Sequence, residues 1–288
     1  MVELSVVVPV LDAGTMLAEQ LTALARQADA PDFEVVVADN GSTDGCLDRV
    51  PEFAGLLSVR VVDAGDRRGA AHARNVGAAH AHGAWLAFCD ADDVVDPGWL
   101  AGLWSAREEG VVVTGPCDVV RLNPEELRAT RSGPGAALSL MPGPCGFLWF
   151  AMSCNLMVSA ADFARIGGWD ESLRYGEDVD LSWRAQLAGL TLRFAPGAVV
   201  HYRYRDSIGD TMRQVRRHAV SEVELFRRFR RSGARRHSVR ETTRRYGGLL
   251  LHSPWLLGGR GPRARWCVTA ASTMGWVEGS VRHRVLYL

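Results

Sequence analysis

The first 115 residues alternate strand-like and helix-like patterns, and this alternation restricts the possible folds more than any other feature of the chain. Helical patterns span residues 14–28, 43–53, 69–82 and 97–107. Between them lie apolar runs typical of strands, at Leu4–Val8, Glu34–Ala38, Ser58–Val62, Trp85–Cys89 and Val111–Thr114. Repeated strand–helix units form a mainly parallel sheet with right-handed crossovers. The sequence therefore predicts an α/β fold with a Rossmann-like sheet flanked by helices, in which ligands bind at the carboxyl ends of the strands.

The rest of the chain falls into three stretches with different patterns. Residues 116–150 are rich in Gly and Pro, and we expect a long irregular loop or lid that crosses the site. Ordered structure returns with helices near 160–167 and 177–188 and strands near 190–195 and 198–202. Residues 206–288 are helical and basic, with an apolar stripe at Ile208, Met212, Val215, Ala219, Val223 and Phe226. We therefore predict one domain over residues 1–205 and a helical Arg-rich extension over 206–288.

The net charge of zero conceals a strong asymmetry between these two parts. Residues 1–205 hold 16 Arg against 27 Asp and Glu, a net charge of −11, whereas residues 206–288 hold 17 Arg against 6, a net charge of +11. Three uses of the basic extension stay open. It packs on the acidic body, it guides an anionic acceptor, or it rests on an anionic membrane face to reach a lipid-linked acceptor.

Composition also favours one cellular compartment. The six cysteines are scattered and form no CxxC pair, which favours reduced thiols over a disulfide or zinc framework. We see no signal-peptide pattern at the start of the chain, and no apolar stretch approaches the roughly 20 residues that span a bilayer. We expect a cytoplasmic protein. The basic extension suggests, as an alternative, peripheral contact with the inner membrane face.

The stretch AWLAFCDADD places three carboxylates at the end of a buried strand. Asp90, Asp92 and Asp93 follow directly on the apolar run at Trp85–Cys89. Two like charges about 4 Å apart repel by roughly 4 kcal/mol at an effective dielectric constant near 20. A divalent cation would neutralise them, and oxygen ligands suit Mg²⁺ or Mn²⁺. The alternative is helix capping ahead of Pro97, for which one Asp would suffice.

Polar side chains follow the other strands of the predicted sheet as well. Asp12 follows the first strand, and Asp39 to Ser42 follow the second, so both groups should open onto the same crevice as the three carboxylates. Asp39 has the chemistry to accept hydrogen bonds from a nucleobase imide or a ribose hydroxyl. Ordinary turn and capping chemistry is the alternative for this stretch. Arg74 either reaches the crevice edge from its helix or forms a surface ion pair.

The order of these pieces along the chain resembles family 2 of the inverting glycosyltransferases, which have a GT-A fold. The pieces are SVVVPV, VVVADNGSTDG, GAAHARNVG, GAWLAFCDADD and GGWDESLRYGEDVDLSWR, and the resemblance covers about residues 3–202. It implies transfer of a sugar from a nucleotide-sugar donor, a UDP-sugar in our interpretation, to an acceptor hydroxyl. Residues 1–115 would then form the nucleotide-binding half of the domain, and residues 116–205 the acceptor-side half.

The resemblance also implies a role for particular residues. The donor nucleotide would lie against Pro9, Val10, Asp12, Asp39, Gly41, Ser42, Arg74, Asp90 and Ala91. Asp90-Ala91-Asp92 looks like the DXD motif, with Asp92 on a Mn²⁺ or Mg²⁺ ion. His201 sits where some members supply a further metal or diphosphate contact, and a structural role is equally open. Glu177-Asp178 looks like the catalytic ED motif, with Asp178 as the base that takes the acceptor proton. First-turn carboxylates favoured by the helix dipole are the alternative for this pair.

Several alternatives remain for the acceptor side and for the function. Trp149 and Trp169 are either acceptor-side aromatics or core residues. The acceptor is a small molecule, a glycan or a lipid-linked molecule. A sugar nucleotidyltransferase is disfavoured because VPVLDAGTM, after the first strand, lacks a Gly-rich loop with a basic residue. A non-catalytic binding protein is disfavoured because Asp90, Asp92 and Asp178 are all present. A nucleic-acid partner is disfavoured by the acidic crevice and the neutral total charge.

Overall fold

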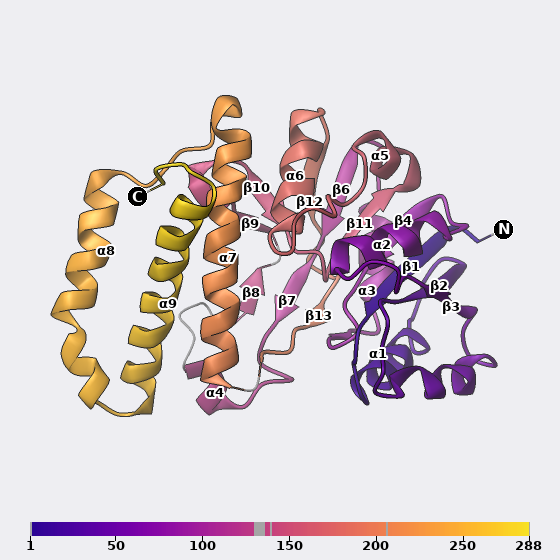
Figure 1. The fold of residues 1–288 in the computed structure, drawn as a ribbon. Coiled ribbons are helices and arrows are strands. Elements are labelled where there is room, and N and C mark those ends of the chain that lie inside the picture. Colours follow the sequence, from indigo (N-terminus) through magenta and orange to yellow (C-terminus); the bar gives the residue numbers. More distant parts are fainter. Residues whose placement is uncertain (1, 130–135, 139, 206, 288) are drawn as a thin grey trace. The chain divides into compact units, whose positions relative to one another are not determined.

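The computed structural model describes residues 2–129, 136–138, 140–205 and 207–287. Its chain divides into two compact units. The first comprises Met1–Arg121, Ala136–Met141 and Trp149–Arg203, and the second comprises Leu122–Gly135, Pro142–Leu148 and Tyr204–Leu288. Figure 1 follows the chain through both.

The first unit is built on a seven-stranded sheet with the order β12-β6-β11-β4-β1-β2-β3. Only β11 runs antiparallel to its neighbours among the strand pairs described. The strands are β1 (Leu4–Val10), β2 (Phe33–Asp39), β3 (Val59–Asp63), β4 (Trp85–Phe88), β6 (Val111–Thr114), β11 (Leu156–Ser159) and β12 (Thr191–Phe194). The predicted strand–helix alternation and the mainly parallel α/β sheet are therefore confirmed.

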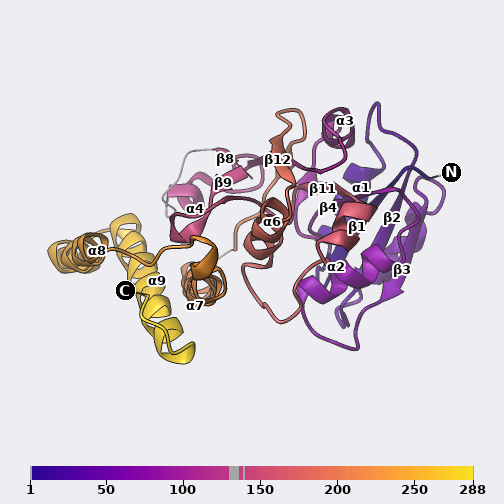
Figure 2. The ribbon, with the colours of Figure 1, turned by 90° about the horizontal axis from the view of Figure 1, so that it is seen from above.

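Helices cover both faces of this sheet, because alternate residues of each strand point to opposite sides. Val6 and Val8 of β1 belong to a core with Leu17, whereas Val7 belongs to a second core with Leu181. The helices are α1 (Met16–Leu24), α2 (Ala70–Ala79), α3 (Trp99–Ser105), α5 (Ala160–Arg165) and α6 (Glu177–Leu187). Figure 2 shows the sheet between α1 and α3 on one side and α2 on the other.

A smaller four-stranded sheet has the order β5-β13-β7-β8. Its strand β5 directly follows the turn that carries Asp90, Asp92 and Asp93, which we call the carboxylate turn. Its strands are β5 (Val94–Val95), β7 (Pro116–Asp118), β8 (Ala136–Leu138) and β13 (Val200–His201). His201 pairs in register with Val94 on one side and Asp118 on the other. This sheet therefore brings His201 close to the segment that follows Asp93.

Two of our local predictions need correction. Residues 43–53 do not form an α-helix but a 3₁₀ helix, η1 (Cys46–Phe53), which contains Pro51 and begins after Gly45 in the left-handed region. Pro51 lacks the N–H that an α-helix would need. Residues 116–150 are not simply irregular. Besides β7 and β8, they contain α4 (Glu125–Ala129), β9 (Leu140–Pro142), η2 (Pro144–Gly146) and β10 (Trp149–Ala151). The part of the predicted lid at 130–135 and 139 lies outside the described residues.

The second unit is mainly helical, as predicted for the extension. Its main helices are α7 (Ile208–Phe229), α8 (Val239–Leu251) and α9 (Arg260–Arg282), with short turns at η3 (Arg230–Ser232) and η4 (Ser253–Leu257). Of the predicted stripe on α7, Ala219, Val223 and Phe226 are buried, whereas Ile208 is exposed. Among the described residues, no helix combines the length and apolar character required to cross a membrane.

Helices α7 and α9 approach closely at two glycines of α9. A Cβ atom on Gly275 would lie 2.3 Å from the carbonyl oxygen of Arg216 and 2.7 Å from the Cβ of Ala219. A Cβ on Gly279 would lie 2.8 Å from a methyl carbon of Val223. These glycines therefore allow backbone contact between the two helices, which any larger residue would force apart.

We expect Gly275→Ala to lower the free energy of unfolding by about 1–3 kcal/mol, because the added methyl meets backbone rather than a flexible side chain. Gly247→Ala, on α8, is the control: a Cβ there has open space. That substitution should stabilise the protein by about 0.5–1 kcal/mol through helix propensity. Urea unfolding of both variants tests the expectation, and equal effects would contradict close packing at Gly275.

Candidate active site

The carboxyl ends of β1 and β2 lie side by side and carry the first group of polar residues. Val10 pairs in register with Asp39, and the N–H of Asn40 donates to the carbonyl of Val10 at 2.8 Å. Asp39 accepts from the N–H of Ser42 at 2.8 Å, and the Ser42 hydroxyl accepts from the N–H of Asp12 at 3.1 Å. The structure thus brings together three of the residues predicted to contact a nucleotide.

The other residues predicted to contact the nucleotide lie in β1 or just after β2 and β4. Val10 and Ala91 are buried, whereas Pro9 and Gly41 are half-buried. Gly41 has φ 85°, a conformation that favours glycine, and a Cβ there would lie 3.5 Å from the guanidinium carbon of Arg68. The positive φ, rather than lack of space, therefore favours glycine where the chain turns beside Asp39.

Two residues that sequence reasoning missed hold the carboxylate turn in place. Gln20, on α1, donates to the carbonyl of Asp90 at 2.9 Å and accepts from the N–H of Val95 at 3.0 Å. Arg203 donates its N–H to Asp93 at 2.8 Å and its Nε–H to the carbonyl of Asp92 at 2.8 Å. Neither residue belongs to a recognisable motif, so only the folded chain reveals them.

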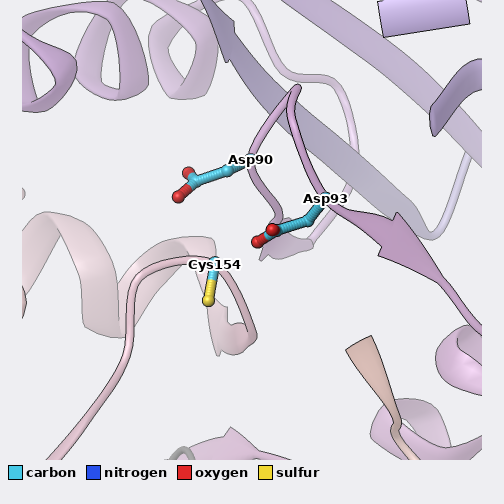
Figure 3. A group of neighbouring side chains, drawn as sticks. All are labelled: Asp90, Asp93 and Cys154. Atoms are coloured by element: carbon cyan, nitrogen blue, oxygen red, sulfur yellow. The ribbon is translucent and has the colours of Figure 1, made fainter. Parts of the chain in front are cut away.

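Asp90, Asp93 and Cys154 form a compact cluster with the chemistry of a cation site. One ligand atom from each residue lies within 4.8 Å of the others (Figure 3). Asp93 is 1% exposed, and its Oδ2 is buried without a hydrogen-bond partner among the described residues. Burial and the neighbouring Asp92 and Asp90 raise the pKa of Asp93 well above its ordinary value. A divalent cation would relieve this repulsion, so the residues fit such an ion.

The predicted metal residues Asp92 and His201 occupy different positions relative to this cluster. Asp92 is half-buried in the same turn. The Nδ1 of His201 lies 2.8 Å from an oxygen of Asp118, and its Nε2 lies 3.5 Å from an oxygen of Asp96. His201 therefore has carboxylate neighbours of its own, and its role at a metal stays a prediction. Cys154 was not among the residues we predicted.

Arg74 connects the carboxylate turn to the predicted ED motif. It is 3% exposed, donates from Nη2 to Asp90 at 2.7 Å, and donates from Nη1 to Glu177 at 3.1 Å. Burial alone would lower the pKa of the guanidinium, but the two carboxylates raise it above its ordinary value. Of the two alternatives for Arg74, the surface ion pair is excluded by this burial.

The ED pair opens helix α6 after Gly176, which has φ 75°. Asp178 is half-buried, and one of its carboxylate oxygens accepts from the N–H of Val179 at 2.8 Å. Burial and the adjacent Glu177 raise the pKa of Asp178 to about 7. A carboxylate with a pKa near neutrality has the proton affinity that general base catalysis requires.

Trp169 packs against Arg74, and Asn75 holds the backbone of Trp169 in place. The Asn75 amide donates to the carbonyl of Trp169 at 2.9 Å, and its oxygen accepts from the Trp169 N–H at 2.9 Å. The Arg74 guanidinium carbon lies 5.1 Å from the centre of the Trp169 ring. Trp169 is 2% exposed and packs edge-on against Phe88. Its burial favours the core alternative over an acceptor contact, whereas Trp149 is 51% exposed.

Comparison with known proteins places the chain in a family. The family model described as Glycosyl transferase family 2 matches residues 5–156, more than half of the chain. The chain therefore belongs to glycosyltransferase family 2. A second model, Glycosyl transferase family group 2, matches residues 85–277 and so continues into the C-terminal helices. The resemblance inferred from the motifs is confirmed.

Two curated relatives are glycosyltransferases. Validoxylamine A glucosyltransferase from Streptomyces hygroscopicus subsp. limoneus is 34% identical over 226 residues, 66% of this chain and 49% of the relative. Pre-mycofactocin glycosyltransferase from Mycobacterium tuberculosis is 28% identical over 215 residues, 72% of this chain and 44% of the relative. The chain thus spans about half the length of these relatives.

Solved structures confirm the GT-A fold. The mannosyltransferase PcManGT from Pyrobaculum calidifontis, in complex with GDP-Man and Mn²⁺, aligns with a TM-score of 0.65 at 19% identity, covering 96% of this chain and 87% of that one. TarS 1–349 from S. aureus, in complex with UDP-GlcNAc, aligns with a TM-score of 0.57 at 20% identity, covering 99% and 93%. At these identities the likeness concerns the fold.

We expect Arg74→Met to destabilise the protein by roughly 3–5 kcal/mol, because it leaves Asp90 and Glu177 without their shared buried cation. Urea unfolding measures the loss. Arg49→Met is the control, since the Arg49–Glu52 pair is exposed and its removal should leave the unfolding midpoint nearly unchanged. Equal midpoints for the two variants would mean that Arg74 does not neutralise the site.

Proposed function

We propose that the protein is a metal-dependent inverting glycosyltransferase, which moves a sugar from a nucleotide-sugar donor to an acceptor hydroxyl in a single displacement. The observation that carries this proposal is the bridge of Arg74 between Asp90 and Glu177. Arg74 connects the carboxylate turn, which has the chemistry of a cation site, to the start of α6, where Asp178 could act as a general base. Family membership supplies the general reaction, and these contacts support the assignment of roles.

The donor nucleotide would bind along the ends of β1, β2 and β4. Asp12, Asp39 and Ser42 form the base and ribose side, together with Pro9, Val10 and Gly41. Asp90, nearer the ribose, and Ala91 follow, and Arg74 adds a further contact on the nucleotide side. We favour a UDP-sugar, in keeping with the UDP-GlcNAc bound in one structural neighbour, while another binds GDP-Man. UDP and GDP are therefore the two probes to compare.

A divalent cation, Mn²⁺ or Mg²⁺, would be held by Asp92 together with Asp93 and Asp90, with His201 as a further contact. When bound, such an ion stabilises the negative charge of a departing diphosphate. The unpartnered Asp93 oxygen and its clustering with Asp90 and Cys154 support a cation at this turn, whereas Asp92 and His201 are assigned from the family resemblance. The structural neighbour PcManGT, which binds Mn²⁺, supports the choice of ion.

Asp178 would act as the base. Its carboxylate accepts the proton of the acceptor hydroxyl as the oxygen attacks the anomeric carbon, and the bond to the diphosphate breaks on the opposite face. One displacement inverts the anomeric configuration. Glu177 orients the site through Arg74 and raises the proton affinity of Asp178.

The acceptor side and the cellular context complete the proposal. The acceptor is a small molecule, a glycan or a lipid-linked molecule, and Trp149 is an exposed aromatic within the predicted acceptor-side half. We place the enzyme in the cytoplasm, with the transferase domain over residues 1–205 and the basic extension over 206–288. A non-catalytic binding protein is less consistent with the raised pKa of Asp178.

The carboxylate turn should make nucleotide binding depend on a cation. We expect UDP or GDP to bind at least tenfold more tightly with Mn²⁺ than in EDTA, and Asp92→Ala and Asp93→Asn to remove this difference, because the diphosphate and the carboxylates share one ion. Isothermal calorimetry measures both affinities. Asp32→Asn, at the opposite end of β2, is the matched control, and metal-independent binding by the unsubstituted protein would refute the cation.

Replacing the proposed base should affect chemistry and spare binding. We expect Asp178→Asn to lower the transfer rate by roughly 10²–10⁴-fold, the usual range for a general base, with unchanged nucleotide affinity. A donor screen by thermal shift selects the sugar, and NMR of the product reports the anomeric configuration. Near-normal turnover would exclude Asp178, and a retained configuration would exclude single displacement.

The raised pKa of Asp178 predicts the pH dependence of the reaction. Only the deprotonated carboxylate accepts a proton, so kcat/KM should rise about tenfold per pH unit below pH 7 and level off above it. Glu177→Gln removes the neighbouring negative charge and should shift the inflection to lower pH. A pH–rate profile that is identical in both proteins would show that another group is titrating.

A further inference from the structure

The connection between α8 and α9 exposes a cluster of large apolar side chains. Leu250 and Leu251 end α8 and are 77% and 76% exposed, and Leu257 at the end of η4 is 91% exposed. Trp255, within η4, is 38% exposed. We call these four residues the apolar tip. In Figure 1 it lies at the turn that joins the two antiparallel helices.

Helix α8 does not use its apolar residues to build a core. None of its described side chains is buried. Polar contacts tie it to α9 instead: the Trp266 ring N–H donates to the carbonyl of Leu249 at 2.8 Å, and Arg245 donates to the Thr273 hydroxyl at 2.8 Å. The exposed leucines therefore contribute little to the folding of the second unit, and folding does not explain their presence.

Exposed arginines lie on the two helices that meet at the apolar tip. Arg240 and Arg244 precede it on α8, and Arg263 and Arg265 follow it on α9; all four side chains are exposed. Between residues 239 and 265 the one acidic residue is Glu241, whose carboxylate accepts from the hydroxyl of Ser238 at the helix start. We call the four arginines the basic collar. On α7, by contrast, Arg216 pairs with Glu278 and Arg228 with Glu224, both at 2.8 Å.

A cavity of about 470 Å³ opens between α8 and α9. Trp255 of the tip lines it with Leu249 and Trp266, and charged side chains, among them Glu241 and Arg244, line it as well. The cavity is therefore amphipathic, and it does not enclose the three exposed leucines of the tip.

We propose that the apolar tip and the basic collar form an element that binds the surface of an anionic lipid bilayer. Leucine and tryptophan side chains would enter the interface between headgroups and acyl chains, and the arginines would meet the anionic headgroups. Tryptophan favours this depth because its ring is apolar and its N–H polar. A second copy of the chain is a poorer occupant, because a symmetric contact brings collar against collar and like charges repel.

Vesicle flotation with the full chain tests the proposal without any donor or acceptor, so its outcome is independent of the proposed transferase chemistry. The probes are phosphatidylcholine vesicles with and without 30% phosphatidylglycerol, at low and physiological salt. We expect binding to the anionic vesicles, weakened by salt. The tip variant Leu250→Ser/Leu251→Ser/Leu257→Ser should reduce the vesicle-bound partition at least about tenfold, and so should the collar variant Arg240→Gln/Arg244→Gln/Arg263→Gln/Arg265→Gln.

The matched control replaces three other exposed apolar residues, Leu56→Ser/Val281→Ser/Leu286→Ser, which are 69%, 75% and 65% exposed. It should bind vesicles like the unsubstituted protein, and circular dichroism should show that all variants keep their helix content. Equal binding to neutral and anionic vesicles, or an unaffected tip variant, would overturn the proposal. Sedimentation that reveals a dimer lost in the tip variant, without vesicle binding, would assign the tip to self-association instead.

Discussion

One buried cation, Arg74, holds the carboxylate at the end of β4 and the carboxylate at the start of α6 together. Its guanidinium is 3% exposed and contacts Asp90 and Glu177, which are separated by 87 positions in the sequence. A buried arginine is stable only when its charge is paired and its donors are used. Asn75, one position further, fixes the loop that carries Trp169 beneath it. Residues of α2 therefore fix the positions of both the turn after β4 and the start of α6.

Much of the first unit could be predicted from the sequence because its signals are local. Each strand is an apolar run with a polar break at its carboxyl end, and Val111–Thr114 was predicted with both of its observed bounds. Parallel pairing then forces those polar breaks to one edge of the sheet, which is why Asp12, Asp39 and Ser42 meet. The prediction failed at η1, where the position of Pro51 rather than the helical periodicity decides the conformation.

What escaped prediction depends on contacts between distant segments. Gln20, Cys154 and Arg203 reach the carboxylate turn from three separate elements, and no motif marks them. The burial of Trp169 under Arg74 is likewise decided by the loop that Asn75 holds. In the second unit, a helical stripe predicted α7, but periodicity alone does not reveal that Gly275 and Gly279 bring α9 into backbone contact with it. Such close approaches depend on which helix packs against which.

The two units use arginine in opposite ways, and this explains the charge asymmetry of the chain. In the first unit an excess of carboxylates is concentrated where negative charge is costly, so Arg74 and Arg203 are partly or fully buried against them. In the second unit the apolar core is thin and polar contacts hold α8, so exposed arginines such as Arg240 and Arg244 cost little free energy in water. The charges of the two units therefore differ in their surroundings: carboxylates of the first unit are buried beside arginines, whereas arginines of the second unit lie on a helical surface with few acidic residues.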